Sequence, residues 1–399
     1  MLLRTSPNFR ALWLGQIVSV IGDGMQRVAL LWWATRTGGN ALLTAVALCA
    51  ALPVVLGSPF GGALADRFDR RRLLVAADVL RLGVTAALAA LVIAGERTPV
   101  IVCLCVAMSA VGTALFDPTY AAAVPTVVPA EDLPAANGLN MANSAVGGLI
   151  GPLLGGVLIA AFGVGTVLVI NAATFAWSVL CILATRLPLP AGGEASARSV
   201  HTTRSALADI LRDRTMRSLT GLAAVLNMVV APVPLLIVVL AVDRFRVGAD
   251  SFGLLQVMIS AGVLIGSITA GTLARGRLAV PMLALGACLT LVGLLPFAAS
   301  AVVLLLGGVA IATANTILLT SIQTAVPAET QGRVFGVLGS LSEGLRPVGM
   351  ALAGSLLAVA GVSGAFAVIG ASVAVATLVW TRGTEARHAA LPEPAAVVG

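Results

Sequence analysis

The chain alternates between long apolar runs and short polar segments. Each run is too apolar to be a soluble helix, and a bilayer-crossing helix needs about 20 mostly apolar residues. The pattern therefore predicts twelve transmembrane helices, the first of which is weakened by internal charges. The predicted spans are residues 11–35, 41–64, 74–95, 99–123, 138–161, 164–185, 218–241, 252–274, 279–299, 301–325, 334–360 and 362–381.

Composition places the chain among all-α integral membrane proteins. Apolar residues make up 59% and charged residues 10%, and the mean hydropathy is +1.03, which excludes a soluble globular protein. The first run lacks a small-residue cleavage site, so we expect a retained helix and not a signal peptide. All five cysteines fall in apolar runs, where we expect no disulfide. With His201 and His388 in polar segments and no catalytic motif, we expect no metal site, no cofactor and no enzyme activity.

Basic residues are distributed unevenly along the chain. The formal net charge is +7, and all 24 basic residues are arginine. With the amino terminus inside, 17 arginines lie in cytoplasmic segments, four lie outside and three lie within spans. The positive-inside rule then puts both termini in the cytoplasm and explains the basic excess without nucleic acid. The exclusive use of arginine is typical of GC-rich bacterial genomes, so we expect a multi-pass protein of the bacterial inner membrane.

The chain repeats itself at an offset of 198 residues. This offset relates Thr126–Glu131 to Thr324–Glu329, and Gly163 to Gly361. Two pseudo-symmetric six-helix bundles in parallel orientation, with a substrate site between them, are a known transporter plan. The predicted units are an N-terminal bundle (1–185), a cytoplasmic linker (186–217), a C-terminal bundle (218–385) and a cytoplasmic tail (386–399).

One predicted span, 138–161, carries small residues at helical spacing. Gly147, Gly151 and Gly155 are four residues apart and share one face, with Pro152 and Gly156 beside them. Such a face lets a neighbouring helix approach closely, as membrane bundles require. The whole set is Gly138, Gly147, Gly151, Pro152, Gly155 and Gly156.

Two motifs resemble those of a known family. The loop after the second span reads Gly62-Ala63-Leu64-Ala65-Asp66-Arg67-Phe68-Asp69-Arg70-Arg71-Arg72-Leu73, and it resembles the signature loop of the major facilitator superfamily. The glycine run resembles the helix-5 antiporter motif of that superfamily's drug exporters. Gly22-Asp23 and the loop suggest the group with macrolide-efflux and enterobactin-exporter-like proteins. The resemblance implies the major facilitator fold and a cytoplasmic gate in which Asp66 pairs with other helix ends. The gate loop residues are Gly62, Asp66, Arg67, Arg70 and Arg71.

The chain departs from the family pattern at two places. Asp69 stands where the loop usually has glycine. The fourth span, near Met108–Gly112, lacks the arginine that proton-coupled members commonly carry. The second departure directs attention to other ionisable residues.

The first span has a polar stripe at helical spacing. The stripe consists of Gln16, Ser19, Asp23 and Gln26/Arg27, and within it Asp23 and Arg27 can pair. Ionisable groups within spans cost about 2.5–3.5 kcal/mol and usually face a cavity or a partner. Either Asp23 exchanges a proton during transport, or the pair only fixes helix packing.

Further polar candidates have similar alternatives. Glu343 and Arg346 are three residues apart. Either Glu343 changes its protonation state during transport with Arg346 as its counter-ion, or the two form a permanent structural pair. Asp117 belongs to the pathway or caps a helix broken at Pro118. Asn227 precedes Pro232, where we expect the helix to be interrupted. Asn140 and Asn227 either bind the substrate or connect helices.

These features predict a secondary transporter. We expect a proton-coupled exporter of a small amphipathic compound, antibiotic-, macrolide- or siderophore-like, which works by alternating access. Its expected partners are the substrate, protons and lipid, and we expect a monomer. The alternatives are a facilitator or importer of the same fold, or a transport-inactive membrane sensor.

Overall fold

The computed structural model describes residues 2–95, 98–187, 214–273, 278–325 and 328–388. Within these ranges every regular element is a helix. The elements are α1 (Leu2–Thr5), α2 (Pro7–Arg67), α3 (Arg70–Ile93), α4 (Pro99–Val127), η1 (Ala130–Asp132), α5 (Leu133–Leu183), α7 (Arg214–Val230), α8 (Val233–Val239), η2 (Leu240–Phe245), α9 (Ala249–Leu273), α10 (Ala279–Val292), α11 (Phe297–Ala325) and α12 (Ala328–His388).

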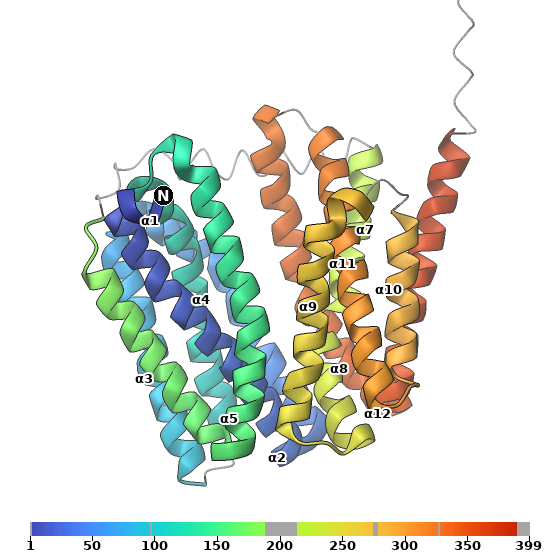
Figure 1. Cartoon of the computed structure of the whole chain (residues 1–399), viewed down its shortest axis with the longest axis horizontal. Helices are drawn as coiled ribbons and strands as arrows, with labels where there is room; N and C mark the ends of the chain where they lie inside the picture. Colours follow the sequence, from blue (N-terminus) through green and yellow to red (C-terminus); the bar gives the residue numbers. More distant parts are fainter. Residues whose placement is uncertain (1, 96–97, 188–213, 274–277, 326–327, 389–399) are drawn as a thin grey trace, which may run out of the picture.

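Three of these helices are twice as long as a membrane is thick. Each contains one glycine with positive φ, where the chain reverses: Gly39 (61°), Gly163 (82°) and Gly361 (63°). Only glycine adopts such angles without strain. Among the described residues, eight helical segments are long and apolar enough to cross a membrane, and α10 is a shorter apolar helix. Counting two spans in α2, α5 and α12 gives eleven spans, and α10 lies at the ninth of the twelve predicted spans, where it ends earlier than expected. The described chain has an all-α membrane fold (Figure 1).

The seventh predicted span is interrupted as expected. α7 ends at Val230, and α8 begins at Val233 after a turn that contains Pro232. Proline lacks a backbone N–H and disfavours helical conformation in the residue before it. The remainder of the span is the π-helical segment η2, which ends at Arg246 in a left-handed conformation.

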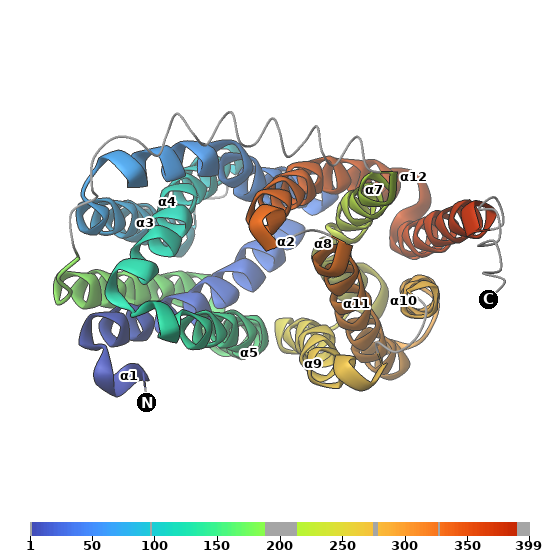
Figure 2. The same cartoon turned by 90° about the horizontal axis from the view of Figure 1, so that it is seen from above.

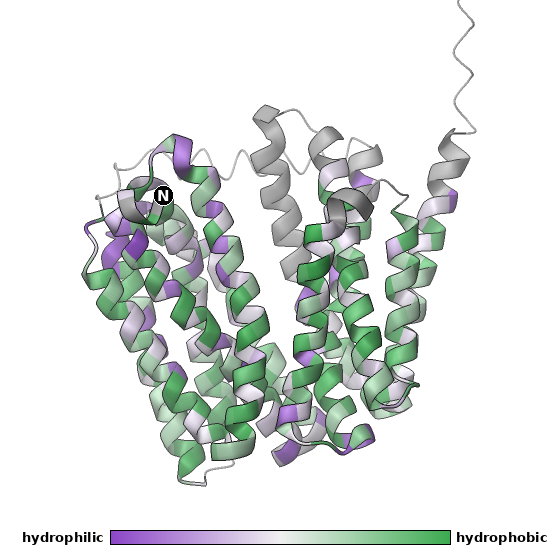
Figure 3. Cartoon of the chain, viewed as in Figure 1, coloured by the Kyte–Doolittle hydropathy of each residue, from purple (hydrophilic) through white to green (hydrophobic). Residues whose placement is uncertain are grey.

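The helices gather into two groups (Figure 2). α4 and α5 pack with both α2 and α3, while α7, α9, α10, α11 and α12 form the second group. Hydrophobic residues cover the flanks of both groups, and hydrophilic residues collect at the two ends (Figure 3). The predicted linker lies mostly outside the described residues, and the boundaries of the two bundles stay a prediction.

The two ends of the molecule differ in how the groups meet. We call the end with the amino terminus and the α2–α3 turn the terminal side, and the end with Gly39, Gly163 and Gly361 the hairpin side. In Figure 1 the groups approach one another at the hairpin side and diverge toward the terminal side.

Two equivalent contacts join the groups near the hairpin side. A Cβ added to Gly156 of α5 would lie 3.0 Å from the Cα of Gly253 in α9. A Cβ added to Gly354 of α12 would lie 2.7 Å from the Oγ1 of Thr44 in α2. The offset of 198 relates Gly156 to Gly354, so the repeat in the sequence appears as a pair of inter-group contacts.

Apolar side chains complete this junction. Trp32 of α2 stacks on Phe252 of α9 with ring centroids 6.1 Å apart. One continuous buried cluster contains residues from both groups, among them Leu43, Ile159 and Leu236. The hairpin side is therefore closed by close backbone approach and by a shared apolar core.

Candidate functional site

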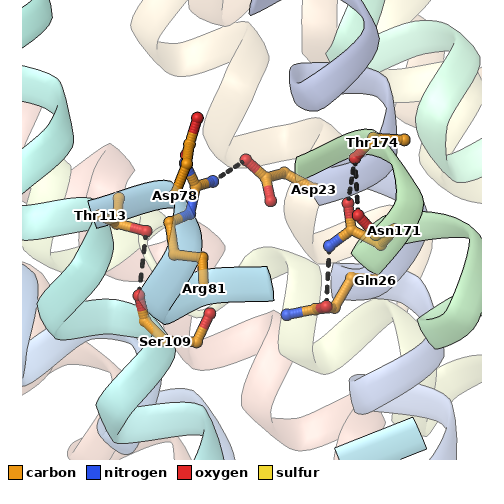
Figure 4. Close-up of polar contacts among 8 residues, drawn as sticks. All are labelled: Asp23, Gln26, Asp78, Arg81, Ser109, Thr113, Asn171 and Thr174. Atoms are coloured by element: carbon orange, nitrogen blue, oxygen red, sulfur yellow. Dashed lines mark hydrogen bonds and ion pairs between the residues drawn. The ribbon is translucent and has the colours of Figure 1, made fainter. Parts of the chain in front are cut away.

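A buried ion cluster lies in the N-terminal group (Figure 4). The Arg81 side chain on α3 is only 4% exposed, and it bridges two carboxylates. Its Nη2 donates to Asp23 Oδ2 on α2 at 2.5 Å, and its Nη1 donates to Asp78 Oδ1 at 3.1 Å. Asp78 is fully buried, whereas the Asp23 side chain is one-third exposed. The cluster thus connects a partly exposed acid to one that is enclosed.

The Arg81 side chain packs against α4, where a glycine leaves room for it. A Cβ added to Gly112 would lie 2.6 Å from Arg81 Cγ, so a glycine is needed at this position. The guanidinium carbon lies 4.1 Å from the ring centroid of Phe175 and 5.4 Å from that of Phe116. Such cation–π contacts stabilise a desolvated guanidinium. The fourth span, which has no arginine near Met108–Gly112, therefore packs against an arginine from α3.

The expected pairing of Asp23 with Arg27 is wrong. Asp23 pairs with Arg81, 58 residues away, and Arg27 forms no ion pair among the described side chains. Arg27 is exposed, and its electrostatic neighbours are Asp23 and Arg346 of α12. Asp23 pairs with Arg81 and not with Arg27 because the Arg81 side chain reaches it from a neighbouring helix. The Phe175 and Phe116 rings hold that side chain in position.

The expectation that Asp117 caps a broken helix is also wrong. α4 runs without a break from Pro99 to Val127, through Pro118. Asp117 is exposed, and it interacts electrostatically with Arg81 and Asp23. It forms no ion pair within the described part of the chain. A third carboxylate therefore adjoins the Arg81 cluster.

Amide and hydroxyl groups connect the same face of α2 to the second span of α5. Asn171 Nδ2 donates to Gln26 Oε1 at 2.8 Å, and Thr174 Oγ1 donates to Asn171 Oδ1 at 2.9 Å (Figure 4). The absence of a side chain at Gly22 makes room for both Asn171 and Thr174. The polar stripe is thus partly used for helix packing.

The glycine run on α5 packs on two helices. Added Cβ atoms on Gly147, Gly151 and Gly155 would lie within 3.0 Å of the first span of α2, including 2.7 Å from Gly24 Cα. Gly156 instead faces α9 of the other group, and the Pro152 carbonyl oxygen adjoins Gly253. Gly138 has open space around it. The glycine run therefore packs against α2 within its own group and against α9 of the other group.

Several polar side chains near the contact between α2 and α5 have incomplete hydrogen bonding. Asn143 is 2% exposed, and neither its Oδ1 nor its Nδ2 has a partner. Gln16 Oε1 on α2 is also buried without a partner. By contrast, Asn140 Oδ1 accepts from the Tyr120 hydroxyl at 3.0 Å, and Asn227 donates to its own helix at Ala223.

Replacing Asn143 with leucine is expected to stabilise the present conformation. A buried unpartnered polar group costs about 1–3 kcal/mol, which the apolar side chain removes. A rise in the thermal unfolding temperature of the detergent-purified protein would show this. The exposed Asn137 provides the control, because Asn137→Leu should leave that temperature unchanged. A lower temperature for Asn143→Leu would mean that Asn143 already has a partner.

The gate residues lie on helix ends and not in a long loop. α2 continues to Arg67 and α3 begins at Arg70, so only Phe68 and Asp69 form the turn. Asp66, near the end of α2, is half-buried and has no hydrogen-bond or ion-pair partner among the described residues. Gly62 lies one turn earlier, against Pro118 of α4.

The residues after the turn have defined structural contacts. Asp69 caps α3 by accepting from the Arg71 backbone N–H at 2.9 Å, which explains an aspartate where the family loop usually has glycine. Arg70 Nε donates to the Ala65 carbonyl at 3.2 Å. The Arg71 guanidinium donates to the carbonyls of Ile182 and Leu183, at the end of α5. Arg71 thus does more than anchor the chain at the membrane surface.

Replacing Asp69 with alanine should destabilise the protein by about 1 kcal/mol, the usual cost of a lost helix cap. Thermal or denaturant unfolding of the purified protein measures the change. Asp132 is the matched control, because it stands at the N-cap of α5 without making a capping bond. Equal losses from Asp69→Ala and Asp132→Ala would contradict the capping role.

The last charged candidates lie on α12. Arg346 is half-buried, and the side chain of Glu343 lies outside the described residues. Sequence reasoning did not select Asp78 and Arg81. Their signal was nevertheless present, since two ionisable residues three apart stand within the apolar run 74–95.

The helical membrane fold of this chain is matched by comparison with known proteins. A profile of the Major Facilitator Superfamily matches residues 12–346. The chain belongs to the major facilitator superfamily. The superfamily consists of transporters, so this chain is a multi-pass membrane transporter by family.

Three curated relatives in the superfamily are exporters by name. Macrolide efflux protein A of Streptococcus pyogenes is 22% identical, over 86% of this chain and 88% of that protein. The multidrug efflux pump Tap of Mycolicibacterium fortuitum is 28% identical over the same shares. The enterobactin exporter EntS of Escherichia coli is 30% identical, over 89% of this chain and 86% of that protein. The group suggested by the two motifs is thereby confirmed.

Solved structures of other transporters share the fold of this chain. A POT family transporter superposes with a TM-score of 0.76 at 11% identity, covering 96% of both chains. An inward-facing bacterial homologue of ferroportin gives 0.73 at 18% identity, covering 96% of this chain and 99% of that one. These likenesses confirm the major facilitator fold of the chain.

Proposed function

We propose that this protein is a proton-coupled exporter of a small amphipathic compound across the bacterial inner membrane. Both termini and the terminal side face the cytoplasm in this proposal, and the protein works as a monomer. The cargo belongs to the broad class in the relatives' names, an antibiotic-, macrolide- or siderophore-like molecule.

The proposal depends chiefly on the excess of carboxylates around Arg81. Asp23 and Asp78 pair with Arg81, and Asp117 interacts with it electrostatically. Arg81, even with Arg27 near Asp23, cannot neutralise three carboxylates, and an uncompensated charge within a span costs about 2.5–3.5 kcal/mol. Binding a proton removes this cost, so the cluster is suited to take up and release protons.

The contacts between the groups supply the conformational part of the proposal. The groups are joined near the hairpin side by the Gly156–Gly253 and Gly354–Thr44 contacts. Asp66, on the terminal side, has no described partner. In the proposed orientation, this combination supports a transporter closed toward the outside with its cytoplasmic gate disengaged. When the groups rock, Asp66 is expected to find a partner as the hairpin-side contacts separate.

Asp23→Asn is expected to abolish proton-driven export. The change keeps the size of the side chain but removes its capacity to exchange a proton and weakens its pairing with Arg81. Proteoliposomes with an imposed pH gradient and a pH-sensitive dye measure the coupling, with erythromycin, enterobactin and ethidium as trial cargoes. We expect at least one cargo to dissipate the gradient, and a loss of about tenfold or more in Asp23→Asn, which corresponds to about 1.4 kcal/mol.

The control is Glu131→Gln, which neutralises an exposed acid on η1 outside the spans. This variant should couple like the unmodified protein. Cargo movement without proton movement would instead favour a facilitator, and uptake driven by the gradient would favour an importer. If no trial cargo moves and no proton flux appears, a transport-inactive sensor becomes the better account.

A further inference from the structure

Two carboxamide side chains at the contact between α2 and α5 lack hydrogen bonds that they could make. Asn143 of α5 is 2% exposed, and neither its Oδ1 nor its Nδ2 has a partner. Gln16 Oε1 of α2 is also buried without a partner. The contact therefore contains one unused donor group and two unused acceptors. Unpartnered buried polar atoms are rare in folded proteins and need an explanation.

The contacts on either side place the two carboxamides at the same level. On one side of them, Trp13 Nε1 of α2 donates to the Leu139 carbonyl oxygen of α5 at 3.2 Å. On the other side, a Cβ added to Gly147 of α5 would lie 2.9 Å from the Val20 carbonyl oxygen of α2. Each carboxamide lies three or four residues from both contacts along its own helix. The two amides are therefore neighbours across the contact, although no hydrogen bond joins them.

A pair of amides is not needed to build a contact of this kind. The offset of 198 residues relates Gly151, which packs on α2, to Gly349, which packs on the Met228 backbone of α7. The first group has its two carboxamides eight residues before this contact on each helix. At the corresponding positions, the second group has Leu341 and Thr220. Since the repeat manages without the amides, their presence in the first group calls for a reason other than packing.

The surface between the two helices allows α5 to move along α2. The glycines of the run that contact α2 have no side chains that would have to pass one another. Pro152, between Asn143 and Gly156, removes one backbone hydrogen bond of α5 and eases its bending. The same helix contacts the other group through Gly156, where an added Cβ would lie 3.0 Å from Gly253 Cα. Separating the groups at the hairpin side therefore removes a contact that holds α5 in its present position on α2.

We propose that Asn143 Nδ2 donates to Gln16 Oε1 when the hairpin side opens, and that this hydrogen bond stabilises the open conformation. The inference rests on the alternating access of the proposed transporter. In the conformation described here, both atoms are buried without partners, which raises the free energy of the closed hairpin side. In the open conformation, a single hydrogen bond satisfies both atoms. The pair thus brings the free energies of the two conformations closer together, as alternation between them requires.

Cysteine labelling of the detergent-purified protein tests this pairing. A cysteine introduced by Thr44→Cys lies at the inter-group contact with Gly354, so its rate of reaction with a bulky maleimide reports opening of the hairpin side. The five native cysteines are replaced by serine in all variants. We expect Asn143→Leu to slow the labelling about fivefold or more, because it removes the hydrogen bond from the open conformation and the unpartnered atoms from the closed one.

The double variant decides whether the two side chains act together. Gln16→Leu alone should slow the labelling as much as Asn143→Leu. The variant with both changes should be no slower than either single variant, because all three lose the same hydrogen bond. If the two slowing factors multiply instead, the side chains act independently and the proposal is overturned. Faster labelling in Asn143→Leu would overturn it as well, since the amide would then stabilise the closed side.

Two further variants separate the amide chemistry from packing. Gln16→Asn combined with Asn143→Gln keeps both carboxamides and their combined length, so it should label like the protein with the original pair. Asn137→Leu changes an exposed amide of the same helix and should do the same. Because the labelling needs neither cargo nor a proton gradient, failure of proton coupling in proteoliposomes would overturn the proposed exporter and leave the labelling result intact.

Discussion

Replacing Arg81 with leucine is expected to cause the largest loss of stability of any single change at the site. Leucine leaves Asp23 and the fully buried Asp78 without their common counter-ion. Removing one partner of a buried ion pair typically costs about 3–5 kcal/mol. Thermal unfolding in detergent and the amount of monodisperse protein after purification should both fall sharply.

Two further variants separate charge from packing at this position. Arg81→Leu combined with Asp78→Asn and Asp23→Asn removes the stranded charges, so stability should largely return while proton coupling stays absent. Arg36→Leu is the matched control, because Arg36 is an exposed arginine near the hairpin side of the same protein. If Arg81→Leu is as stable as Arg36→Leu, the cluster does not contribute to the fold.

Enlarging Gly156 is expected to have the largest effect on conformation. A Cβ at this position would lie 2.6 Å from the Ala249 carbonyl oxygen and 3.0 Å from Gly253 Cα, both backbone atoms that cannot rotate away. Gly156→Val should therefore destabilise the closed hairpin side by about 1–3 kcal/mol, as overpacking usually does. The population should shift about tenfold or more toward states open on that side.

Cysteine accessibility measures this shift. A reporter cysteine at Thr44, on the equivalent inter-group contact, should react faster with a membrane-impermeant maleimide in Gly156→Val than in unmodified protein. Gly148→Val is the control, since an added Cβ at Gly148 of the same helix meets nothing within 4 Å. Equal labelling rates in the two valine variants would refute a gating role for the Gly156 contact.

The hydrophobic pattern predicted much of the fold because membrane helices are specified locally. Span length, the glycine run and the repeat can all be read from residues close together in the chain. The tight reversals at Gly163 and Gly361 coincide with the repeat at an offset of 198. The single-glycine geometry of these reversals could not be predicted, because their positive φ depends on how the paired spans pack.

The ion cluster was harder to predict because its partners are distant in sequence. Helical spacing suggested that Asp23 pairs with Arg27, whereas in the structure Asp23 pairs with Arg81 of α3. The spacing rule considers one helix only, and here the decisive feature is Gly112 on a third helix, which makes room for the Arg81 side chain. Asp69 shows the same limit, since its departure from the family loop is explained only by the cap it forms on α3.

The single-residue reversals at Gly39, Gly163 and Gly361 affect how this protein can be studied. Each of these reversals takes a single residue, so proteases and antibodies would find few exposed peptides there. Epitope insertion there would have to interrupt the positive-φ glycine turn and would disrupt two spans at once. Topology mapping of intact cells should therefore place its tags elsewhere, for example in the longer connection around Arg246 between η2 and α9.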